Sequence, residues 1–354
     1  MTTNTIIHET GGMPSLKKLE RRLKSKLYGG SRFFIIVDEN TSSHCLPTLV
    51  SEVSPLQESE FFEVEAGETC KDIDVVRNLW EALLESGADR NAVIINLGGG
   101  TVCDLGGFVA ASYKRGIRYI NVPTSLLAMV DAAVGGKTAI NVGGLKNQAG
   151  FFYKPQTVCI ETAFLQTLPQ RELLSGSFEM AKTFAVADKE MFGSFCTSWK
   201  EQNAIHKELI YRCAEIKQNI VSHDPRDTGE RKKLNFGHTF GHAMESAMLK
   251  HGKDALSHGE AVGLGMVCAM YLSAKKTGLK KKVYEDFAAT VCRLLGKRHF
   301  TKEITDTIIH NLYADKKNAD GDIRLVLLKD VGEAVFDIPA SETEIREALS
   351  ALCR

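Results

Sequence analysis

Three of the ten histidines in the chain, His238, His242 and His258, fall within one short segment. The first two belong to LNFGHTFGHAMES (234–246) and are four residues apart, so in a helix their rings would share one face. Two such histidines with a carboxylate from another segment would form a zinc site with an open position. The local spacing leaves open whether both histidines of this stretch bind metal, as in the H-E-x-x-H proteases, or only one.

Other residues near the histidines could bind an anion or support the metal. Arg231 and Asn235 lead into His238, and we expect them to lie on its side of the same helix, where they could bind an anionic substrate. In GSFEMAK, Glu179 and Lys182 are three residues apart on one expected helix face. On this pair alone, an exposed ion pair worth less than about 1 kcal/mol is the simpler interpretation.

A second group of candidate residues lies in the N-terminal half. NLGGGTVCDLGGF places three glycines between an expected strand and an expected helix, where backbone N–H groups favour a pyrophosphate. It is not G-x-G-x-x-G, so tight-turn glycines are an equally good interpretation. Asp38 and Asn40 end another expected strand, where a carboxylate is well placed for a ribose hydroxyl. Glu68 and Lys71 follow in GETCK, although each alone is typical of an ordinary surface.

The stretch 122–150 is a third candidate region. It holds Asp131, Lys137, Lys146 and Asn147 among glycines and small residues. An exposed charged face would normally carry more glutamate and less glycine, so we favour a binding site here.

The elements that must position these residues follow two patterns. In the first part of the chain, short apolar runs alternate with amphipathic segments, which predicts a parallel sheet covered by helices. From about residue 168 the pattern is helical, apart from one possible strand at 323–328. We expect strands within 32–40, 117–125 and 157–165, a helix within 72–90, and a strand, a glycine turn and a helix in succession within 91–113. The prediction is an α/β nucleotide-binding domain (1–168) and a mainly α-helical domain for metal and substrate (169–354), closely docked with the active site between them.

Composition excludes several classes of protein. The 354 residues exceed one ordinary core, and 44 Lys plus Arg balance 44 Asp plus Glu, so no basic field favours nucleic acid or an anionic membrane. Nine cysteines, an odd number without a C-x-x-C pair, predict reduced thiols. We see no signal-peptide core and no apolar run near the roughly 20 residues of a membrane span, and expect a cytoplasmic protein.

Taken together, the segments from VDEN to DKKNADG resemble the 3-dehydroquinate synthase family of the sugar phosphate cyclase superfamily. The resemblance implies an N-terminal α/β domain for NAD, a helical C-terminal domain for zinc, with Co²⁺ as an alternative, and a homodimer. The motifs that carry it, in the family's order and spacing, are GGGTVCDLGGFVAASYKRG, VPTSLLAMVDAAVGGKTAIN, LKNQAGFFYKP, TLPQRELLSGSFEMAK, LNFGHTFGHAMES and HGEAV.

The same resemblance implies a role for individual residues. The metal ligands would be Glu179, His238 and His258. The residues implied to bind NAD are Asp38, Asn40, Glu68, Lys71, Gly99, Gly100, Thr101, Asp104, Thr124, Ser125, Lys146, Asn147, Phe164 and Thr167. The residues implied to bind or act on the substrate are Arg115, Asp131, Lys137, Lys182, Lys217, Arg231, Asn235 and His242, with Lys316 or Lys317 of DKK.

The implied activity is that of a carbon–oxygen lyase in the shikimate pathway to aromatic amino acids. It converts 3-deoxy-D-arabino-heptulosonate 7-phosphate to 3-dehydroquinate and phosphate. The steps are transient oxidation by NAD, β-elimination of phosphate, re-reduction, ring opening and aldol closure. Zinc would act as a Lewis acid on the substrate hydroxyls. His242, with an ordinary pKa of about 6.5, could shuttle protons, and the lysines and Arg231 would supply cations for phosphate and carboxylate.

Three other functions would share some of these motifs. A related cyclase that makes a valiolone or an inosose would share the NAD and metal motifs. Such relatives tend to lose the residues that receive the substrate carboxylate, so Arg231 and Asn235 favour a carboxylate-bearing substrate. A metal-dependent polyol dehydrogenase would need an exchangeable cofactor and no phosphate clamp, which the many site lysines disfavour. A non-catalytic binding module would not need every ligand and cation intact.

The sequence departs from the family pattern at a few positions. Ser125 replaces the second threonine of P-T-T but keeps a hydroxyl. Phe178 stands where a small residue is usual, which predicts altered packing beside Glu179. The segment LKHGKDAL before His258 is longer than in some members, which affects the expected shape of that loop.

Overall fold

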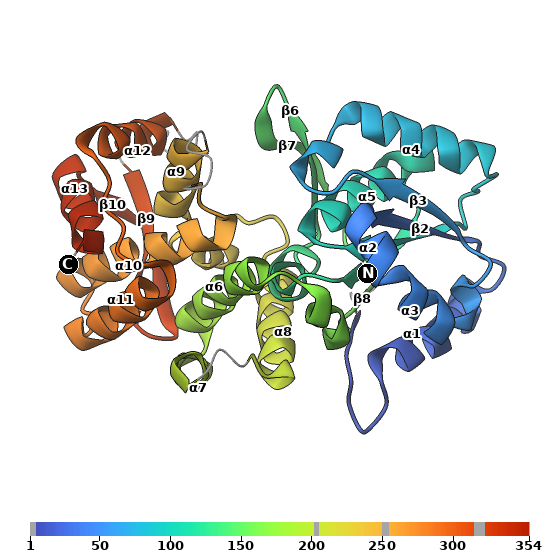
Figure 1. Ribbon diagram of the computed structural model, residues 1–354, viewed down its shortest axis with the longest axis horizontal. Helices are drawn as coiled ribbons and strands as arrows, with labels where there is room; N and C mark the ends of the chain where they lie inside the picture. The colour runs from blue at the N-terminus through green and yellow to red at the C-terminus, as the bar shows by residue number, and fades with distance from the viewer. Residues whose placement is uncertain (1–4, 202–204, 250–254, 315–322, 354) are drawn as a thin grey trace. The chain divides into compact units, whose positions relative to one another are not determined.

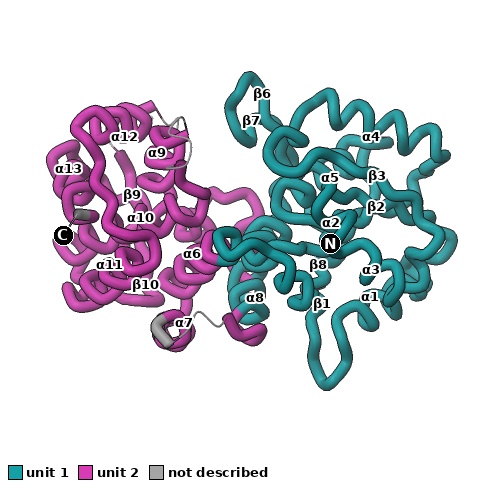
Figure 2. Tube along the Cα trace, viewed as in Figure 1, with its two compact units in different colours: residues 1–173, 210–218 teal, residues 174–209, 219–354 magenta. Residues whose placement is uncertain are grey.

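The computed structural model describes residues 5–201, 205–249, 255–314 and 323–353, which form two compact units (Figures 1 and 2). Unit 1 comprises residues 1–173 and 210–218, and unit 2 comprises residues 174–209 and 219–354. The segment 210–218 lies inside one helix, so this helix contributes side chains to unit 1 although it is flanked by residues of unit 2. Within the described residues, none of the helices is both long and apolar enough to cross a lipid bilayer.

Unit 1 is built on a six-stranded parallel sheet with strand order β1-β8-β5-β4-β2-β3. The central strands are rich in Val and Ile and buried on both faces, as parallel strands require. The six strands are β1 (Thr5–Ile7), β2 (Phe33–Asp38), β3 (Glu60–Val64), β4 (Val93–Gly98), β5 (Arg118–Pro123) and β8 (Thr157–Cys159). The expected strands in 32–40, 91–113, 117–125 and 157–165 are confirmed, and β1 and β3 are additional.

Helices cover this sheet, as the alternating sequence predicts. Phe34, Ile36 and Ile94 join the core formed with α4 and α5, whereas their neighbours Ile35 and Ile95 point to the opposite face. The helices of unit 1 are α1 (Ser15–Leu23), α2 (Glu39–His44), α3 (Leu46–Glu52), α4 (Ile73–Glu85) and α5 (Gly100–Ser112).

The stretch of small and charged residues after β5 contains a β-hairpin. Strands β6 (Lys137–Val142) and β7 (Leu145–Phe152) pair antiparallel. The two-residue turn between them consists of Gly143 and Gly144, with φ of 60° and 78°. A turn with positive φ at both central residues matches the twist of the strands and strongly favours glycine, which explains the sequence GG at this point.

Unit 2 is mainly helical, and the expected fold class is thereby confirmed for both units. Its central helix, α10 (His258–Lys276), is buried continuously from Gly259 to Met270 and is therefore apolar nearly all round. The helices are α6 (Gln170–Ala187), α7 (Lys189–Glu201), α9 (His238–Met248), α10 (His258–Lys276), α11 (Lys281–Leu295), α12 (Lys302–Ala314) and α13 (Glu342–Ser350). Helix α8 (Lys207–His223) is shared, because its residues 210–218 belong to unit 1. The expected strand at 323–328 is confirmed as β9 (Ile323–Asp330), which pairs antiparallel with β10 (Glu333–Ala340).

Candidate active site

A buried carboxylate, that of Glu179, lies among three basic side chains in unit 2. Its Oε1 atom is 3.4 Å from Nε2 of His238 and 3.5 Å from Nε2 of His258. Its Oε2 atom is 2.5 Å from Nζ of Lys182. The Glu179 and Lys182 side chains are 1% and 2% exposed, so the interpretation of this pair as an exposed ion pair is wrong. The reason is that α6 is buried on every side from Ser175 to Val186.

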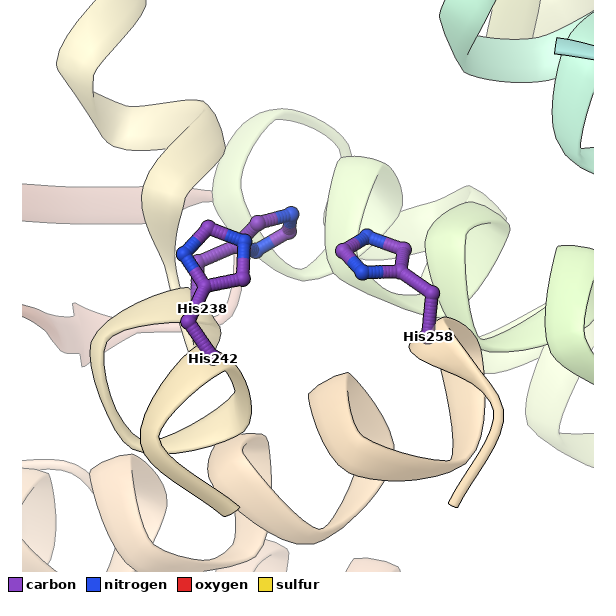
Figure 3. Close-up of side chains that lie close together, drawn as sticks. All are labelled: His238, His242 and His258. Atoms are coloured by element: carbon purple, nitrogen blue, oxygen red, sulfur yellow. The ribbon is translucent and has the colours of Figure 1, made fainter. Parts of the chain in front are cut away.

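The residues of this cluster suit a metal ion. Oε1 of Glu179 is buried and accepts no hydrogen bond from the described residues, which is costly unless a cation lies beside it. The ligand nitrogens of His238, His242 and His258 lie within 4.8 Å of one another, and His258 faces the other two rings (Figure 3). One carboxylate and imidazole nitrogens are typical zinc ligands. The distances are compatible with His242 as well as Glu179 beside the other two histidines.

Burial and neighbouring charges shift the pKa values of Glu179, His238 and His258. Desolvation raises the pKa of Glu179, but Lys182 and the two histidines outweigh it and hold the pKa well below its usual range. Desolvation, together with Lys182, lowers the pKa of His238 well below its ordinary value against the opposing effect of Glu179. For His258 desolvation is outweighed by Glu179 and Glu245, which raise its pKa to about 10.

Gly237 lies between the 3₁₀ helix that ends at Asn235 and the helix that carries His238. Its φ is 77°, and a Cβ there would lie 2.6 Å from Cγ of Met266, so both conformation and space require glycine. Helix α9 therefore begins at His238, while Arg231 and Asn235 lie in a separate 3₁₀ helix. The expectation that these two residues share a helix with His238 is wrong.

Hydrogen bonds from the loop 224–229 hold Arg231 in place, and the sequence motifs did not predict this loop. Its backbone N–H donates to Asp224 at 3.1 Å, and its Nη1 donates to the carbonyl of Pro225 at 3.1 Å. Asp224 also accepts from the backbone N–H of Gly229 at 2.7 Å and of Thr228 at 3.1 Å. Desolvation raises the pKa of Asp224, but these hydrogen bonds outweigh it and lower the pKa to about 2. An Asp followed by Pro and then Gly is the only sequence signal for this loop.

In unit 1, predicted cofactor residues follow four neighbouring strands at one edge of the sheet. Asp38 ends β2, Gly99 follows β4 and Thr124 follows β5. Thr167 and Phe164 lie in a 3₁₀ helix (Thr162–Thr167) after β8. The carboxyl edge of a parallel sheet is where nucleotides bind in folds of this type. Gly100 and Thr101 form the first turn of α5, so their backbone adjoins the same edge.

A hydrogen-bond network joins four more predicted cofactor residues. Nζ of Lys71 lies 2.8 Å from Oδ2 of Asp104 and donates to Oδ1 of Asn147. Asn141 donates to Oε2 of Glu68 at 3.1 Å and accepts from the backbone N–H of Asn147 at 2.9 Å. Burial raises the pKa of Asp104, and Lys71 opposes this effect. Sequence reasoning missed Asn141, because one amide between two candidate motifs carries no signal of its own.

Asp38 and Ser125 also make hydrogen bonds that order the backbone at this edge. Asp38 caps α2 by accepting from the backbone N–H of Thr41 at 2.8 Å, and Asn40 lies in that short helix. Ser125 accepts from the backbone N–H of Ala128 at 3.3 Å, which fixes the turn after β5. Lys146 directly precedes Asn147 in β7.

Two predicted substrate residues form an ion pair within unit 1. Nζ of Lys217, from α8, lies 2.5 Å from Oδ1 of Asp131, which lies in a π-helical turn (Ala128–Ala132). Lys137 begins β6. Arg115 follows the end of α5, which runs back from the carboxyl edge to the amino edge of the sheet, so Arg115 lies away from the strand ends described above. Lys316 and Lys317 lie outside the described residues.

Both halves of the chain match the models of one enzyme family. Residues 61–175 match the model described as 3-dehydroquinate synthase N-terminal, and residues 176–318 match the C-terminal model of the same enzyme. This chain belongs to the 3-dehydroquinate synthase family. A 3-dehydroquinate synthase of Parabacteroides distasonis is 39% identical over 321 residues, covering 90% of each chain. One of Endomicrobium trichonymphae is 40% identical over 315 residues, covering 86% of this chain and 84% of the relative.

Solved structures of sugar-phosphate cyclases share the fold. A 2-epi-5-epi-valiolone synthase of Streptomyces hygroscopicus subsp. jinggangensis, with NAD⁺ and Zn²⁺ bound, aligns with a TM-score of 0.82 and 25% identity over 99% of this chain and 97% of that chain. A 2-deoxy-scyllo-inosose synthase complexed with carbaglucose-6-phosphate, NAD⁺ and Co²⁺ aligns with a TM-score of 0.81 and 24% identity over 98% of this chain and 95% of that chain.

The structure also explains how this member of the 3-dehydroquinate synthase family accommodates Phe178 beside Glu179. The Phe178 ring is fully buried and packs edge-on against Trp199, with ring centroids 5.0 Å apart. A Cβ on Gly263 of α10 would lie 2.5 Å from Cδ1 of Phe178. The absence of a side chain at Gly263 therefore makes room for the ring, and the expected change in packing is taken up by α10.

Proposed function

We propose that this protein is a 3-dehydroquinate synthase of the shikimate pathway. It converts 3-deoxy-D-arabino-heptulosonate 7-phosphate to 3-dehydroquinate and phosphate, with NAD and zinc as cofactors. Identity of 39–40% to relatives of that name, over most of the chain, supports the activity. The observation that favours a carboxylate-bearing substrate is the buried Arg231 in the 3₁₀ helix that ends at Asn235.

We assign the metal to Glu179, His238 and His258. Both histidines direct Nε2 toward Oε1 of Glu179, and that oxygen has no hydrogen-bond donor among the described residues. A bound zinc ion would supply a Lewis acid for the substrate hydroxyls, while bound NAD would take up a hydride and return it within one turnover. His242, one turn after His238, is then available to donate or accept a proton on the substrate.

The cations of the chain have distinct proposed roles. Lys182 neutralises Glu179 and so keeps this ligand ionised in a buried environment. Arg231 is positioned by backbone hydrogen bonds and offers a guanidinium to the substrate carboxylate. Lys217 is almost fully buried and oriented by Asp131, and we assign it, with Lys137, to the substrate phosphate or hydroxyls.

The strand ends of unit 1 are the proposed NAD site. Backbone N–H groups at Gly99 and Gly100 would receive the pyrophosphate at the start of α5, and Asp38 would receive ribose hydroxyls. The network of Lys71, Asp104 and Asn147 would fix the position of the dinucleotide.

We also propose a cytoplasmic homodimer. Family members are usually homodimers, and the hairpin β6–β7 exposes Val142, Leu145, Phe151 and Phe152, an apolar surface typical of protein contacts. Light scattering during size-exclusion chromatography measures the mass directly. A monomeric mass across the working concentration range would contradict the dimer and leave the proposed reaction intact.

The activity is tested by incubating the purified protein with heptulosonate phosphate, NAD⁺ and Zn²⁺. We expect release of inorganic phosphate in step with 3-dehydroquinate, and no net NADH. Phosphate release from a heptulose phosphate without the carboxylate, but not from heptulosonate phosphate, would instead identify a related cyclase. Sustained NADH formation with glycerol would identify a polyol dehydrogenase.

A further inference from the structure

Glu245 is an acidic residue of α9 to which neither the motifs nor the proposed mechanism gives a role. Its Oε2 atom lies 3.1 Å from Nδ1 of His258, and its side chain is 12% exposed. We propose that Glu245 is a positioning residue that orients His258 and fixes its tautomer for metal binding. This inference rests on the proposed metal site and adds one residue to it.

The position of one hydrogen atom decides which ring nitrogen of His258 can bind a metal ion. An ionised carboxylate only accepts hydrogen bonds, so the hydrogen between Glu245 and His258 must reside on Nδ1. Nε2 is then the atom whose lone pair is left for a metal ion. It is also the atom of His258 that lies 3.5 Å from Oε1 of Glu179. The contact with Glu245 therefore selects the nitrogen that faces the proposed metal position.

His238 is arranged in the same way with a different acceptor. Its Nδ1 lies 3.3 Å from the backbone carbonyl of Phe236, which also only accepts. Its Nε2 lies 3.4 Å from Oε1 of Glu179. Two histidines from different helices thus present the same nitrogen to one carboxylate oxygen. The anionic acceptor makes His258 the more basic of the two ligands.

The packing of α9 against α10 places Glu245. Gly241 and Glu245 are four residues apart and therefore lie on one side of α9, and Gly237 directly precedes the helix. A Cβ on Gly237 would meet Met266 of α10, and a Cβ on Gly241 would lie 3.1 Å from Cα of Val262. The two glycines let the backbone at the start of α9 approach α10 closely, and Glu245, one turn after Gly241, contacts His258 at the start of α10.

The test uses Co²⁺ as the probe, because its visible absorption bands report both binding and coordination. Each protein is titrated with Co²⁺ after removal of metal. We expect Glu245→Gln to weaken Co²⁺ binding by about 10- to 100-fold and to shift the bands. Glu303→Gln removes the same charge from an exposed position on α12 and should bind as wild type does. Equal affinities for the two variants would overturn the role of Glu245, whereas a wild-type protein that binds no Co²⁺ would overturn the proposed metal site itself.

Two further measurements separate positioning from a general loss of structure. In a His258→Ala background, adding Glu245→Gln should weaken Co²⁺ binding no further, since the residue acts through that ring. An additional loss of similar size would show that Glu245 acts elsewhere. In the zinc-loaded wild type, ¹⁵N NMR of His258 should show a protonated Nδ1 and a metal-bound Nε2. The opposite tautomer would contradict the inference without any variant.

Discussion

Lys182 Nζ lies 2.5 Å from Oε2 of Glu179, one turn earlier on α6, and both side chains are almost completely buried. The ion pair occupies one carboxylate oxygen and leaves Oε1 directed at His238 and His258. Burial penalises a lone carboxylate, so the lysine is what allows an ionised ligand to persist in this environment. Lys182 therefore acts on the metal site through Glu179 as well as by any contact with substrate.

Replacing Lys182 by methionine should destabilise the metal-free protein. The substitution leaves a buried carboxylate with only histidines as partners, which costs about 3 kcal/mol, the low end for a broken buried pair. Urea unfolding measures the change, and added Zn²⁺ should recover part of it. Lys282→Met breaks an exposed pair with Asp286 and should change stability by less than about 0.5 kcal/mol. Equal effects of the two substitutions would contradict the buried pair.

Two substitutions distinguish a metal ligand from a residue that acts on the substrate. Glu179→Gln should abolish zinc retention through dialysis, because it removes the anionic ligand. His242→Ala should keep zinc and slow turnover by about 100-fold or more, as loss of a general acid–base group does. Elemental analysis and a phosphate-release assay give the two readouts. Equal zinc loss in both variants would make His242 a ligand, a role that the ring distances also allow.

The sequence predicts those features of the fold that repeat along the chain. Short apolar segments identify β2, β4 and β5, and 3.6-residue periodicity identifies α4 and the helices of unit 2. The hairpin β6–β7 has no such signal, because glycines and polar residues interrupt its alternation. Strand β10 also lacks such a signal, because it contains a proline and its pairing with β9 has two register shifts.

Burial and helix ends are harder to predict than element type. The spacing of Glu179 and Lys182 indicates a shared face, but not that α6 is buried all round. Likewise, LNFGHTFGHAMES has a helical pattern throughout, yet the left-handed conformation of Gly237 starts the helix at His238. The close approach of Met266, which is distant in sequence, also leaves no space for a side chain at this position. Tertiary contacts of this kind decide whether Arg231 and Asn235 belong to the same helix as His238.

Asp224→Asn should reduce stability in a pH-dependent way. The pKa of Asp224 is lowered to about 2 in the folded protein, below the unfolded value of about 3.9. Its contribution is therefore fully present above about pH 5 and is lost as the pH falls toward 2. Urea midpoints of wild type and variant should differ most at neutral pH and converge as the pH falls to about 2. A difference that stays constant down to pH 2 would mean that the carboxylate charge has no role.

The same substitution should also loosen Arg231, because its own backbone N–H and that of Gly229 lose a charged acceptor. We expect KM for the carboxylate-bearing substrate to rise more than kcat falls. An unchanged KM would separate the loop's contribution to stability from substrate binding.

Gly263→Ala should destabilise unit 2 through the ring of Phe178. The new Cβ would lie 2.5 Å from Cδ1 of a fully buried phenylalanine, and overpacking of this kind costs about 1–3 kcal/mol. Gly193→Ala on α7 is a matched control, because a Cβ there meets no atom within 4 Å. Both variants gain about 1 kcal/mol of helix propensity, so their difference in urea unfolding isolates the clash. Adding Phe178→Leu to Gly263→Ala should recover part of the lost stability. If the single variant Gly263→Ala is as stable as Gly193→Ala, the Phe178 ring has space to move and the predicted clash is contradicted.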